Sequence, residues 1–461
     1  MRGKKIIASA MALALVLAAA SCGQEKKSGG KVTIKVGNWP DDTKPQQVEV
    51  YNGYVKKMNE LYPDIEVVPD TYQYDVKTFM AKGASNQLPT VYTTWFSEIG
   101  KIITSGYAAD ITKQMNENGY SKSLNPELLS LVSKDSKIYA IPKDSYAQGL
   151  FVNVNLFTEA GLIDENGLPI YPKTYEEMAQ TAKTIKEKTG KAGFIIPATS
   201  NMGGWHFMNI AWSYGVKFEE QDADGKWKST FDTPECVAAL QYVKDLKWKY
   251  NCVPENILVD KNEMMRMFAT DQAAMCFLDP PSGKLVTDYG MNKDNEMVVS
   301  MPEGPQGRYS QMGGNVQMIA PNATDEEIDA VFKWMEITGC SPELTEEGKA
   351  GIESNIQATL AKNGIVLDQT PFKIWVSDER NNTEKEIRSK YANIDPRKFQ
   401  NYYDFENVII NPEEAQGAQE LYAILDKCIQ EVLTNEQADP AQLIKQAASD
   451  FQKNCLDKAI D

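Results

Sequence analysis

Short apolar stretches alternate with amphipathic ones along the first part of the chain. Residues 32–36 alternate apolar and polar side chains as a strand does, and residues 65–68 and 88–92 are two further apolar stretches of strand length. Between them, apolar residues recur at helical spacing over 46–62 and 74–86. Strands that alternate with helices through short loops predict a mainly parallel, doubly wound α/β sheet with right-handed crossovers.

The middle of the chain has a strand, a polar break and a second strand. Residues 138–141 are apolar, and Pro142 is expected to end this strand because proline cannot donate to a central ladder. A polar interval at 143–148 precedes a second strand at 150–154 and a short helix that ends at Gly161. This order predicts that the chain leaves one compact lobe here and enters another.

The rest of the chain repeats these signals. The pattern predicts caps at Thr174 and Thr324, a buried strand at 194–196, a loop over 197–204 and a hairpin turn at Asp224-Gly225. Two long helices are predicted near the C-terminus, over 412–433 and 440–460, where they are expected to cover the second lobe. Residues 351–407 are polar and have no clear periodicity.

Two stretches resemble the family 1 extracellular solute-binding proteins of ABC importers. The first joins Ile141-Pro142, a polar gap, Gly149 and Leu156–Leu162 (LFTEAGL), and the second is Phe268–Met275, with Asp271 where the family usually has glycine. Aspartate tolerates the left-handed conformation, so we expect the turn at Asp271 to be kept. The resemblance implies two lobes joined by a hinge, the periplasmic-binding-protein-like type II fold, in which Gly313–Ile319 makes the return crossing.

The resemblance also implies how the chain is divided. The N-terminal lobe is expected to comprise 32–145 and 315–375, and the C-terminal lobe 146–314 and 376–461. Tyr139–Gly149 and Ser310–Asn315 are therefore predicted to be neighbouring hinge strands, although they are far apart in the sequence. The implied partners are a solute and the transmembrane permease subunits of an ABC importer, and the protein is expected to be a monomer.

Length and charge limit the kinds of protein and of partner that need to be considered. A chain of 461 residues is too long for one ordinary core, and its hydrophobic content of 42% is typical of globular proteins. The formal charge of −16 becomes 45 − 64 = −19 without residues 1–21, which carry three basic and no acidic residues. So acidic a surface argues against nucleic acid and anionic headgroups as partners.

The N-terminus has the features of a lipoprotein signal peptide. Basic residues at 2–5 precede an apolar run over 6–20 that is too short to span a bilayer comfortably. The small residues before Cys22 resemble a lipobox, which implies that 1–21 is removed and Cys22 carries the lipid. Residues 22–31 are then a flexible tether, and the protein is anchored on the outer face of the cytoplasmic membrane. The alternative is an ordinary secretory peptide cleaved nearby.

Catalytic and metal-binding patterns are weak. His206 is the single histidine, and it has no nucleophile signature near it, so we expect no catalytic triad. The acidic stretch 220–224 lacks the bidentate glutamate of a calcium loop, and neither a P-loop nor a dinucleotide fingerprint is present, so no metal or cofactor is expected. A surface glycosidase needs only two carboxylates and stays open, as does an adhesive lipoprotein.

Six cysteines follow Cys22. They have no CxxC spacing, and a chain of this size does not need covalent staples, so we expect six free and mostly buried thiols.

Aromatic and polar residues at predicted loops indicate the ligand. Sugars offer apolar faces and polar edges, so their sites combine flat aromatic rings with fixed hydrogen-bonding groups. The expected stacking residues are Trp39, Trp95, Tyr146 and Trp205, and the expected polar contacts come from Asp41, Asn201, Asp279, Gly314 and Asn315. The predicted function is capture of a carbohydrate, expected to be an oligosaccharide, with a polyamine or a peptide as the alternative solute.

The lipobox leads to the first testable prediction. If Cys22 carries the anchor, Cys22→Ala should release the protein from membranes or leave its signal peptide attached, because no thiol is left to acylate. Fractionation and mass spectrometry of the N-terminus measure both. A variant that stays tightly membrane-bound with its leader removed would contradict the prediction.

Overall fold

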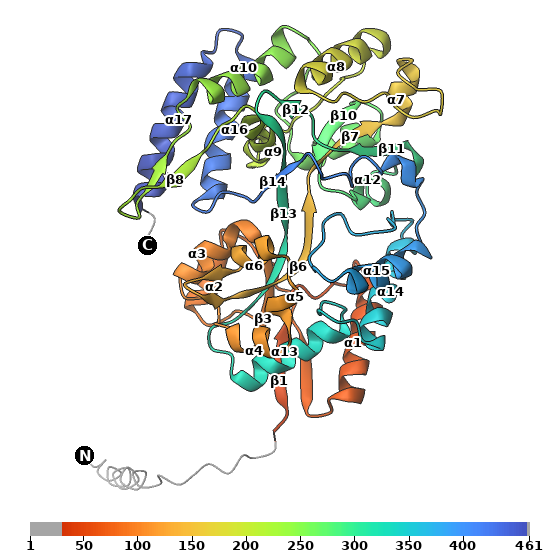
Figure 1. Ribbon diagram of the computed structural model, residues 1–461, viewed down its shortest axis with the longest axis vertical. Helices are drawn as coiled ribbons and strands as arrows, with labels where there is room; N and C mark the ends of the chain where they lie inside the picture. The colour runs from red at the N-terminus through yellow and green to blue at the C-terminus, as the bar shows by residue number, and fades with distance from the viewer. Residues whose placement is uncertain (1–29, 459–461) are drawn as a thin grey trace, which may run out of the picture.

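The computed structural model describes residues 30–458. The predicted signal peptide and Cys22 lie outside the described residues. Figure 1 shows two lobes stacked along the longest axis, with β13 and β6 running between them. The strands are β1 (Val32–Val36), β2 (Ile65–Pro69), β3 (Val91–Trp95), β4 (Ser133–Lys134), β5 (Lys137–Ile138), β6 (Ala140–Ala147), β7 (Gly149–Asn153), β8 (Glu219–Gln221), β9 (Trp227–Ser229), β10 (Met275–Leu278), β11 (Glu296–Val299), β12 (Glu303–Gly304), β13 (Gly307–Ile319) and β14 (Ile409–Asn411).

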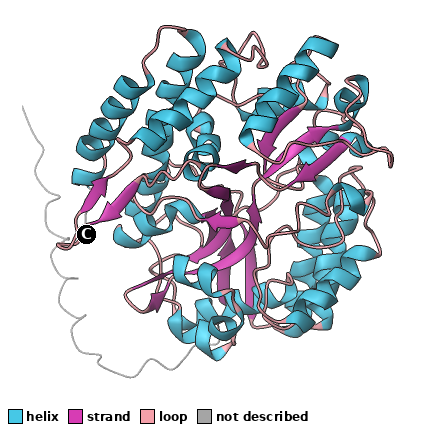
Figure 2. Cartoon of the chain, turned by 45° about the horizontal axis from the view of Figure 1, so that its top comes forward, coloured by secondary structure: helices cyan, strands magenta, loops and turns pink. Residues whose placement is uncertain are grey.

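Helices cover the sheets of both lobes, as Figure 2 shows. The α-helices are α1 (Pro45–Leu61), α2 (Phe79–Ala84), α3 (Ile99–Thr104), α4 (Thr112–Glu117), α5 (Tyr120–Ser123), α6 (Pro126–Leu131), α7 (Val154–Glu159), α8 (Tyr175–Thr189), α9 (Met202–Ser213), α10 (Pro234–Trp248), α11 (Lys261–Ala269), α12 (Gly283–Thr287), α13 (Asp325–Ile337), α14 (Glu346–Leu360), α15 (Asp378–Ser389), α16 (Ala418–Thr434) and α17 (Pro440–Asn454). Short 3₁₀ helices are η1 (Phe96–Glu98), η2 (Lys293–Asn295), η3 (Pro396–Lys398) and η4 (Leu456–Lys458).

The first lobe has the predicted parallel sheet. Strand β1 pairs in parallel with β2 and with β3, and β13 returns antiparallel beside β3. The apolar residues of these strands and of α1 and α13 form one core. The capping box at Thr324 is confirmed, because its hydroxyl accepts from Glu327 N while the Glu327 carboxylate accepts from Thr324 N.

The second lobe departs from the predicted parallel arrangement. Its central strand β7 is antiparallel to both β10 and β11, because the chain enters β7 directly from the crossing strand β6 without an intervening helix. The predicted strand at 194–196 is an extended segment, in which Ile195 N donates to Met275 O. Asp271 has the expected positive φ of 56°.

The C-terminal helices cover the second lobe as predicted, since residues of α16 and α17 belong to its core. Residues 351–407 are more regular than their sequence indicates, because α14 and α15 lie there. Helix α15 packs against α14 beside α1, although it falls within 376–461. The expected boundary between the lobes in this part of the chain stays a prediction.

The two hinge strands are neighbours, as predicted. Strand β6 pairs antiparallel with β13 from Ala147 opposite Met312 to Ala140 opposite Met318. The expectation that Pro142 ends the strand is wrong. Among the described strands, β6 pairs only with β13, and Pro142 sits beside the register shift at Asn315 and Val316, where a missing N–H leaves the ladder intact.

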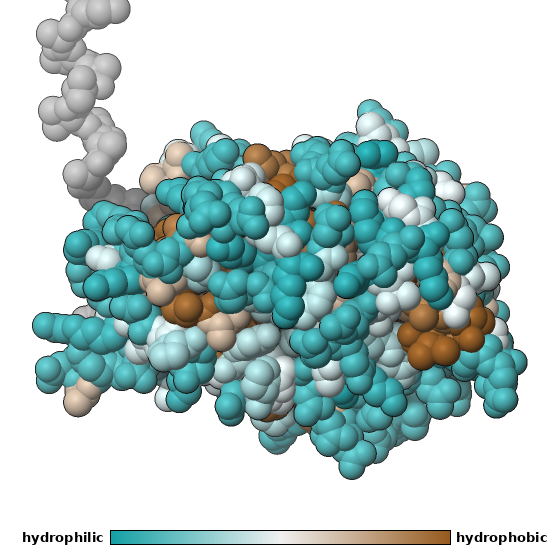
Figure 3. All heavy atoms as spheres, turned by 90° about the horizontal axis from the view of Figure 1, so that it is seen from above, coloured by the Kyte–Doolittle hydropathy of each residue, from teal (hydrophilic) through white to brown (hydrophobic). Residues whose placement is uncertain are grey.

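The visible surface is mainly polar. Figure 3 shows a face that is mainly hydrophilic, with hydrophobic side chains gathered in small separate patches. No helix between residues 30 and 458 has the length and apolar character that crossing a bilayer requires. All six cysteines of the described part are free, and four of them are buried.

The close approach of the hinge strands predicts a large effect of Gly314→Ala. Gly314 has φ of 149°, and an added Cβ would collide with the Asp144 carbonyl oxygen. The strained backbone should lower the free energy of unfolding by about 1–3 kcal/mol. Gly53→Ala in α1 is the control, because a Cβ there meets nothing within 4 Å and the substitution favours the helix. Equal melting temperatures for Gly314→Ala and the wild type would contradict the prediction that alanine strains the backbone at this position.

Candidate functional site

A row of three side chains crosses the sheet between the lobes. Trp95 at the end of β3 lies opposite Asn315 on β13, and Asn315 lies opposite Asp144 on β6. Residues directly opposite one another across strands point to the same face of a sheet. Asp144 Oδ1 accepts from Asn315 N at 3.0 Å and from Asn315 Nδ2 at 2.8 Å. The row therefore joins an indole, an amide and a carboxylate on one surface.

Asp144 lies in a cleft. Its side chain is exposed to solvent, yet the surrounding protein excludes enough water to raise the pKa of the carboxyl group. Lys143 and the hydrogen bonds from Asn315 act in the opposite direction. A side chain that contacts solvent but is partly desolvated is expected at the bottom of a groove, and Asp144 has both properties.

Trp95 supplies the aromatic surface on the first-lobe side. Its side chain is 40% exposed, and its ring meets Tyr74 edge to face, with centroids 5.3 Å apart. The Tyr74 hydroxyl donates to the buried carboxylate of Glu98. The indole is thus held at its edge and has one face available to a ligand.

Tyr146 lies two residues along β6 from Asp144, on the same face. It is opposite Gly313, where a Cβ would lie 2.5 Å from the Tyr146 hydroxyl oxygen, so the ring packs directly over the glycine backbone. Burial raises the pKa of Tyr146 well above its usual value, and the carboxyl groups of Asp279 and Glu413 raise it further. Acidic groups of the second lobe therefore approach the hinge at this ring.

On the second-lobe side of the hinge, an ion pair lies against the ring of a tryptophan. Lys261 Nζ pairs with Asp279 and lies 4.8 Å from the centroid of the Trp205 ring. Trp205 Nε1 donates to Glu413 Oε1 at 3.1 Å. The predicted contacts Trp205 and Asp279 are therefore close to each other, and both already have protein partners.

The environment predicted for Trp205 is wrong, because Trp205 lies in the first turns of helix α9 and not beside a loop, whereas Asn201 lies in the predicted loop and directly precedes the helix. Asn201 caps the helix with φ of 67° and donates from its backbone to Asp426, while Trp205 is only 6% exposed. The two preceding glycines suggested a loop. A Cβ at Gly203 would lie 2.8 Å from an Asp426 oxygen, so here glycine serves the close packing of α9 on α16.

Trp39 and Asp41 lie away from the row. Trp39 is 5% exposed and stacks on Trp334 in the first-lobe core, with centroids 6.0 Å apart. Asp41 Oδ1 accepts from Thr43 N at 3.0 Å and from the Thr43 hydroxyl, which closes a local turn. The structure thus gathers Trp95, Tyr146, Asp279 and Asn315 near the hinge with Gly314 beneath them, and whether any predicted residue contacts the solute stays a prediction.

Glu413 and Glu414 were missed because the sequence favoured a helix from residue 412. The chain instead turns there, and α16 begins at Ala418. Glu413 accepts from Trp205 and from the Tyr422 hydroxyl, and Glu414 accepts from Trp212 Nε1 at 3.3 Å. Burial raises the pKa of each of these carboxyl groups to about 7.

A cavity of about 760 Å³ adjoins the hinge. Residues 143–145, the loop before α1, and Pro281 and Gly283 of the second lobe line it, together with the segment 361–377, which we call the strap. Ile365 and Leu367 of the strap pack into a second-lobe core, whereas Trp375 packs into the first-lobe core. The strap therefore contacts both lobes.

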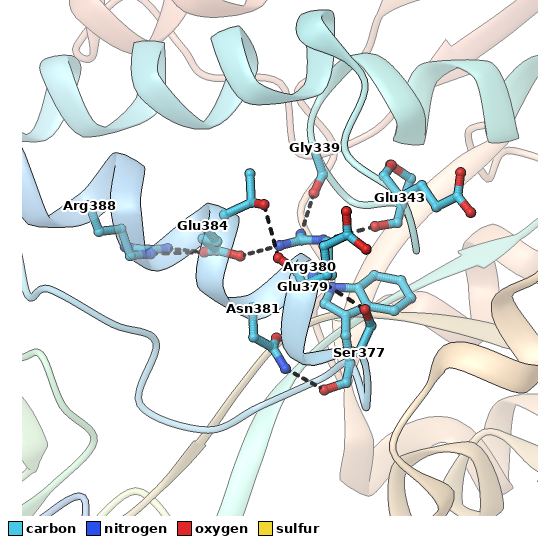
Figure 4. Close-up of polar contacts among 11 residues, drawn as sticks. Gly339, Glu343, Ser377, Glu379, Arg380, Asn381, Glu384 and Arg388 are labelled. Carbon is cyan, nitrogen blue, oxygen red and sulfur yellow. Dashed lines mark hydrogen bonds and ion pairs between the residues drawn. The ribbon is translucent and has the colours of Figure 1, made fainter.

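A buried ion network fixes the strap (Figure 4). Arg380 Nη1 donates to Glu384 at 2.7 Å, while its other nitrogens donate to Gly339 O and Ser341 O. Arg388 also donates to Glu384. Asn381 Nδ2 donates to Trp375 O at 2.8 Å, which ties the strap to α15.

His206 lies inside α9 without exposure. Its Nδ1 is 2.6 Å from Met202 O and its Nε2 is 3.0 Å from Phe277 O. Burial lowers the pKa of this imidazole to about 4. Between residues 30 and 458, no three His, Cys, Asp or Glu side chains gather in a group that could hold a metal ion.

The family is decided by comparison with known proteins. A family model described as bacterial extracellular solute-binding protein matches residues 44–337. The chain belongs to this family. The protein is therefore a non-catalytic solute-binding protein of an ABC transporter, as the resemblance implied.

Relatives of this solute-binding protein are distant in sequence. It is 22% identical over 357 residues to a putative binding protein of Brucella abortus (strain 2308), across 74% of this chain and 83% of the relative. It is 26% identical over 266 residues to the diacetylchitobiose binding protein DasA of Streptomyces coelicolor, across 52% of this chain and 56% of the relative. Maltose-bound MalE3 of T. maritima matches its fold with a TM-score of 0.66 at 21% identity, across 91% and 99% of the two chains. The predicted fold class is confirmed.

The raised pKa of Glu413 predicts how the stability of this solute-binding protein depends on pH. Because the folded-state pKa of about 7 exceeds the ordinary value of 4.5, Glu413 lowers the free energy of unfolding as pH rises from about 4.5 to 7. Glu413→Gln cannot ionise but can still accept from Trp205. The free energy of unfolding of the variant minus that of the wild type should therefore be higher at pH 8 than at pH 4.5, by on the order of 2 kcal/mol.

Melting curves from pH 4.5 to 8 measure this change. Glu436→Gln, in the exposed segment after α16, is the matched control and should follow the wild type. Parallel pH profiles for Glu413→Gln and the wild type would show that Glu413 does not titrate in this range.

Proposed function

We propose that this solute-binding protein captures a carbohydrate, and specifically an oligosaccharide, between its lobes and delivers it to the permease of its transporter. The row of Trp95, Asn315 and Asp144 carries the proposal. A half-exposed indole can stack on the apolar face of a sugar, while the amide and the carboxylate can hold its hydroxyl groups.

Delivery requires that the loaded state differ from the empty one. A ligand shifts a two-state protein only by its differential affinity for the two states, so the sugar must contact both lobes. Trp95 offers such contacts from the first lobe, the Lys261–Asp279 pair offers them from the second, and Asp144 lies on the connecting strand. Bending of β6 and β13 then closes the lobes over the solute.

The names of two relatives support a sugar. One is named for diacetylchitobiose, and the neighbouring structure holds maltose. We further propose that Cys22 anchors the protein on the outer face of the membrane, where a tethered receptor stays close to its permease.

A cationic solute is the second candidate, because Asp279, Glu413 and Asp144 all act on the pKa of Tyr146 and so lie around its ring. Lys261 already pairs with Asp279, which reduces the negative charge available to a polyamine. Calorimetry with spermidine beside a panel of neutral and acidic oligosaccharides separates the two candidates. Saturable binding of spermidine without binding of any saccharide would overturn the proposal.

The proposal predicts opposite effects for two tryptophans. Trp95→Ala removes an exposed stacking face and should weaken saccharide binding by about ten- to hundredfold, while the unliganded melting temperature changes little. Trp39→Ala instead leaves a cavity in the first-lobe core and should lower the free energy of unfolding by about 3–5 kcal/mol.

Ligand titrations and melting curves of both variants test this pair. Normal affinity in Trp95→Ala, measured with the best saccharide of the panel, would remove Trp95 from the site.

A further inference from the structure

The cavity beside the hinge has a positive lining in an acidic protein. Its ionisable lysines and arginines are Lys44, Lys143, Arg380 and Arg388, and its acidic residues are Asp144 and Glu384, so the sum is 4 − 2 = +2. The chain as a whole carries −16. The net charge of the cavity lining is therefore opposite in sign to the net charge of the whole chain.

The two arginines are largely committed to structure. Arg380 and Arg388 each pair with Glu384 at 2.7 Å, so this cluster holds the strap in place (Figure 4). The acidic residue Asp144 is hydrogen-bonded to Asn315. Asp144 keeps its negative charge, because the Asn315 amide is neutral, and the positive charges left to meet a ligand are those of the two lysines.

Lys143 is the better placed of these lysines. It lies in the crossing strand β6 at the register shift, and no ion pair or hydrogen bond of its Nζ occurs within residues 30–458. Its side chain is only partly exposed. The ammonium group can therefore donate to an anionic group from outside. The charges of Tyr51 and Asp144 outweigh the effect of desolvation and raise the pKa of Lys143, which keeps it charged.

Other polar atoms of the lining also lack partners. Asn38 Oδ1 and Ser145 Oγ are buried, and neither has a hydrogen-bond partner in the described part of the chain. Both residues line the cavity, as does the partly buried Tyr51. An acceptor, a hydroxyl and an aromatic side chain around a cation form the combination that a charged sugar unit requires.

We propose that this cavity receives an acidic unit of the saccharide, whose anionic group accepts a hydrogen bond from Lys143. That group is the carboxylate of a uronic acid or a sulfate or phosphate ester on the sugar. Its hydroxyl groups are held by Asn38 and Ser145. The inference rests on the proposed function and narrows it from carbohydrates in general to anionic saccharides.

Calorimetry with matched ligand pairs tests the proposal on the full chain. Each neutral disaccharide or trisaccharide, such as galactobiose, is titrated beside its uronate, such as digalacturonate, and beside its sulfated and phosphorylated forms. The wild type should bind at least one charged member at least tenfold more tightly than its neutral counterpart. That preference should decrease when the ionic strength is raised, because salt screens the attraction. Which charged member binds identifies the anionic group.

Lys143→Met removes the ammonium group and keeps most of the apolar stem. The variant should lose at least tenfold in affinity for the charged ligand and change less than twofold for the neutral one. Lys183→Met in α8 is the control, because it also removes one positive charge but from a residue that does not line the cavity. It should leave both affinities unchanged.

The outcomes separate the two proposals. Tight binding of neutral saccharides with no preference for any charged partner overturns the anionic unit and leaves the proposed function standing. A charged-ligand preference that survives Lys143→Met overturns the role of Lys143. Failure of every saccharide to bind overturns the proposed function and this inference together.

Discussion

The close pairing of β6 with β13 is the constraint on which the rest of the structure depends. The two strands are far apart in the sequence, yet they approach so closely that Gly313 and Gly314 leave no room for a side chain. Each lobe is consequently assembled from separate stretches of sequence. The same pairing places Asn315 beside Asp144, so the connection between the lobes is also the floor of the cleft. The contacts that stabilise the fold and the proposed binding surface thus come from one pair of strands.

Much of this fold could be predicted from local sequence, because its signals are local. Helical periodicity located α1 to within one residue and found α16 and α17 with one end of each correct, and side-chain chemistry gave the cap at Thr324. The errors arose where tertiary contacts override a local rule. Pro142 continues a strand because it lies on an edge beside a bulge, and Gly203 sits in a helix because α16 approaches it. No window of neighbouring residues contains those partners.

The site was harder to predict for the same reason. Two residues of the proposed site, Trp95 and Asn315, could be chosen from the sequence because each lies at the end or crossing of a predicted strand. Lys261 and Glu413 could not, because both meet Trp205, and Glu413 does so across 208 residues of sequence. Trp39 has the residue type and the position expected of a binding residue, but its burial against Trp334 is decided by α13, which follows almost three hundred residues later.

The central claim is that a saccharide bound at the hinge draws the two lobes together. Small-angle X-ray scattering of the purified protein, with and without a saturating saccharide, measures this most directly. Closure about β6 and β13 predicts a smaller radius of gyration in the loaded protein and a return to the initial value after dialysis. An unchanged radius of gyration while calorimetry shows the site to be saturated would contradict the account.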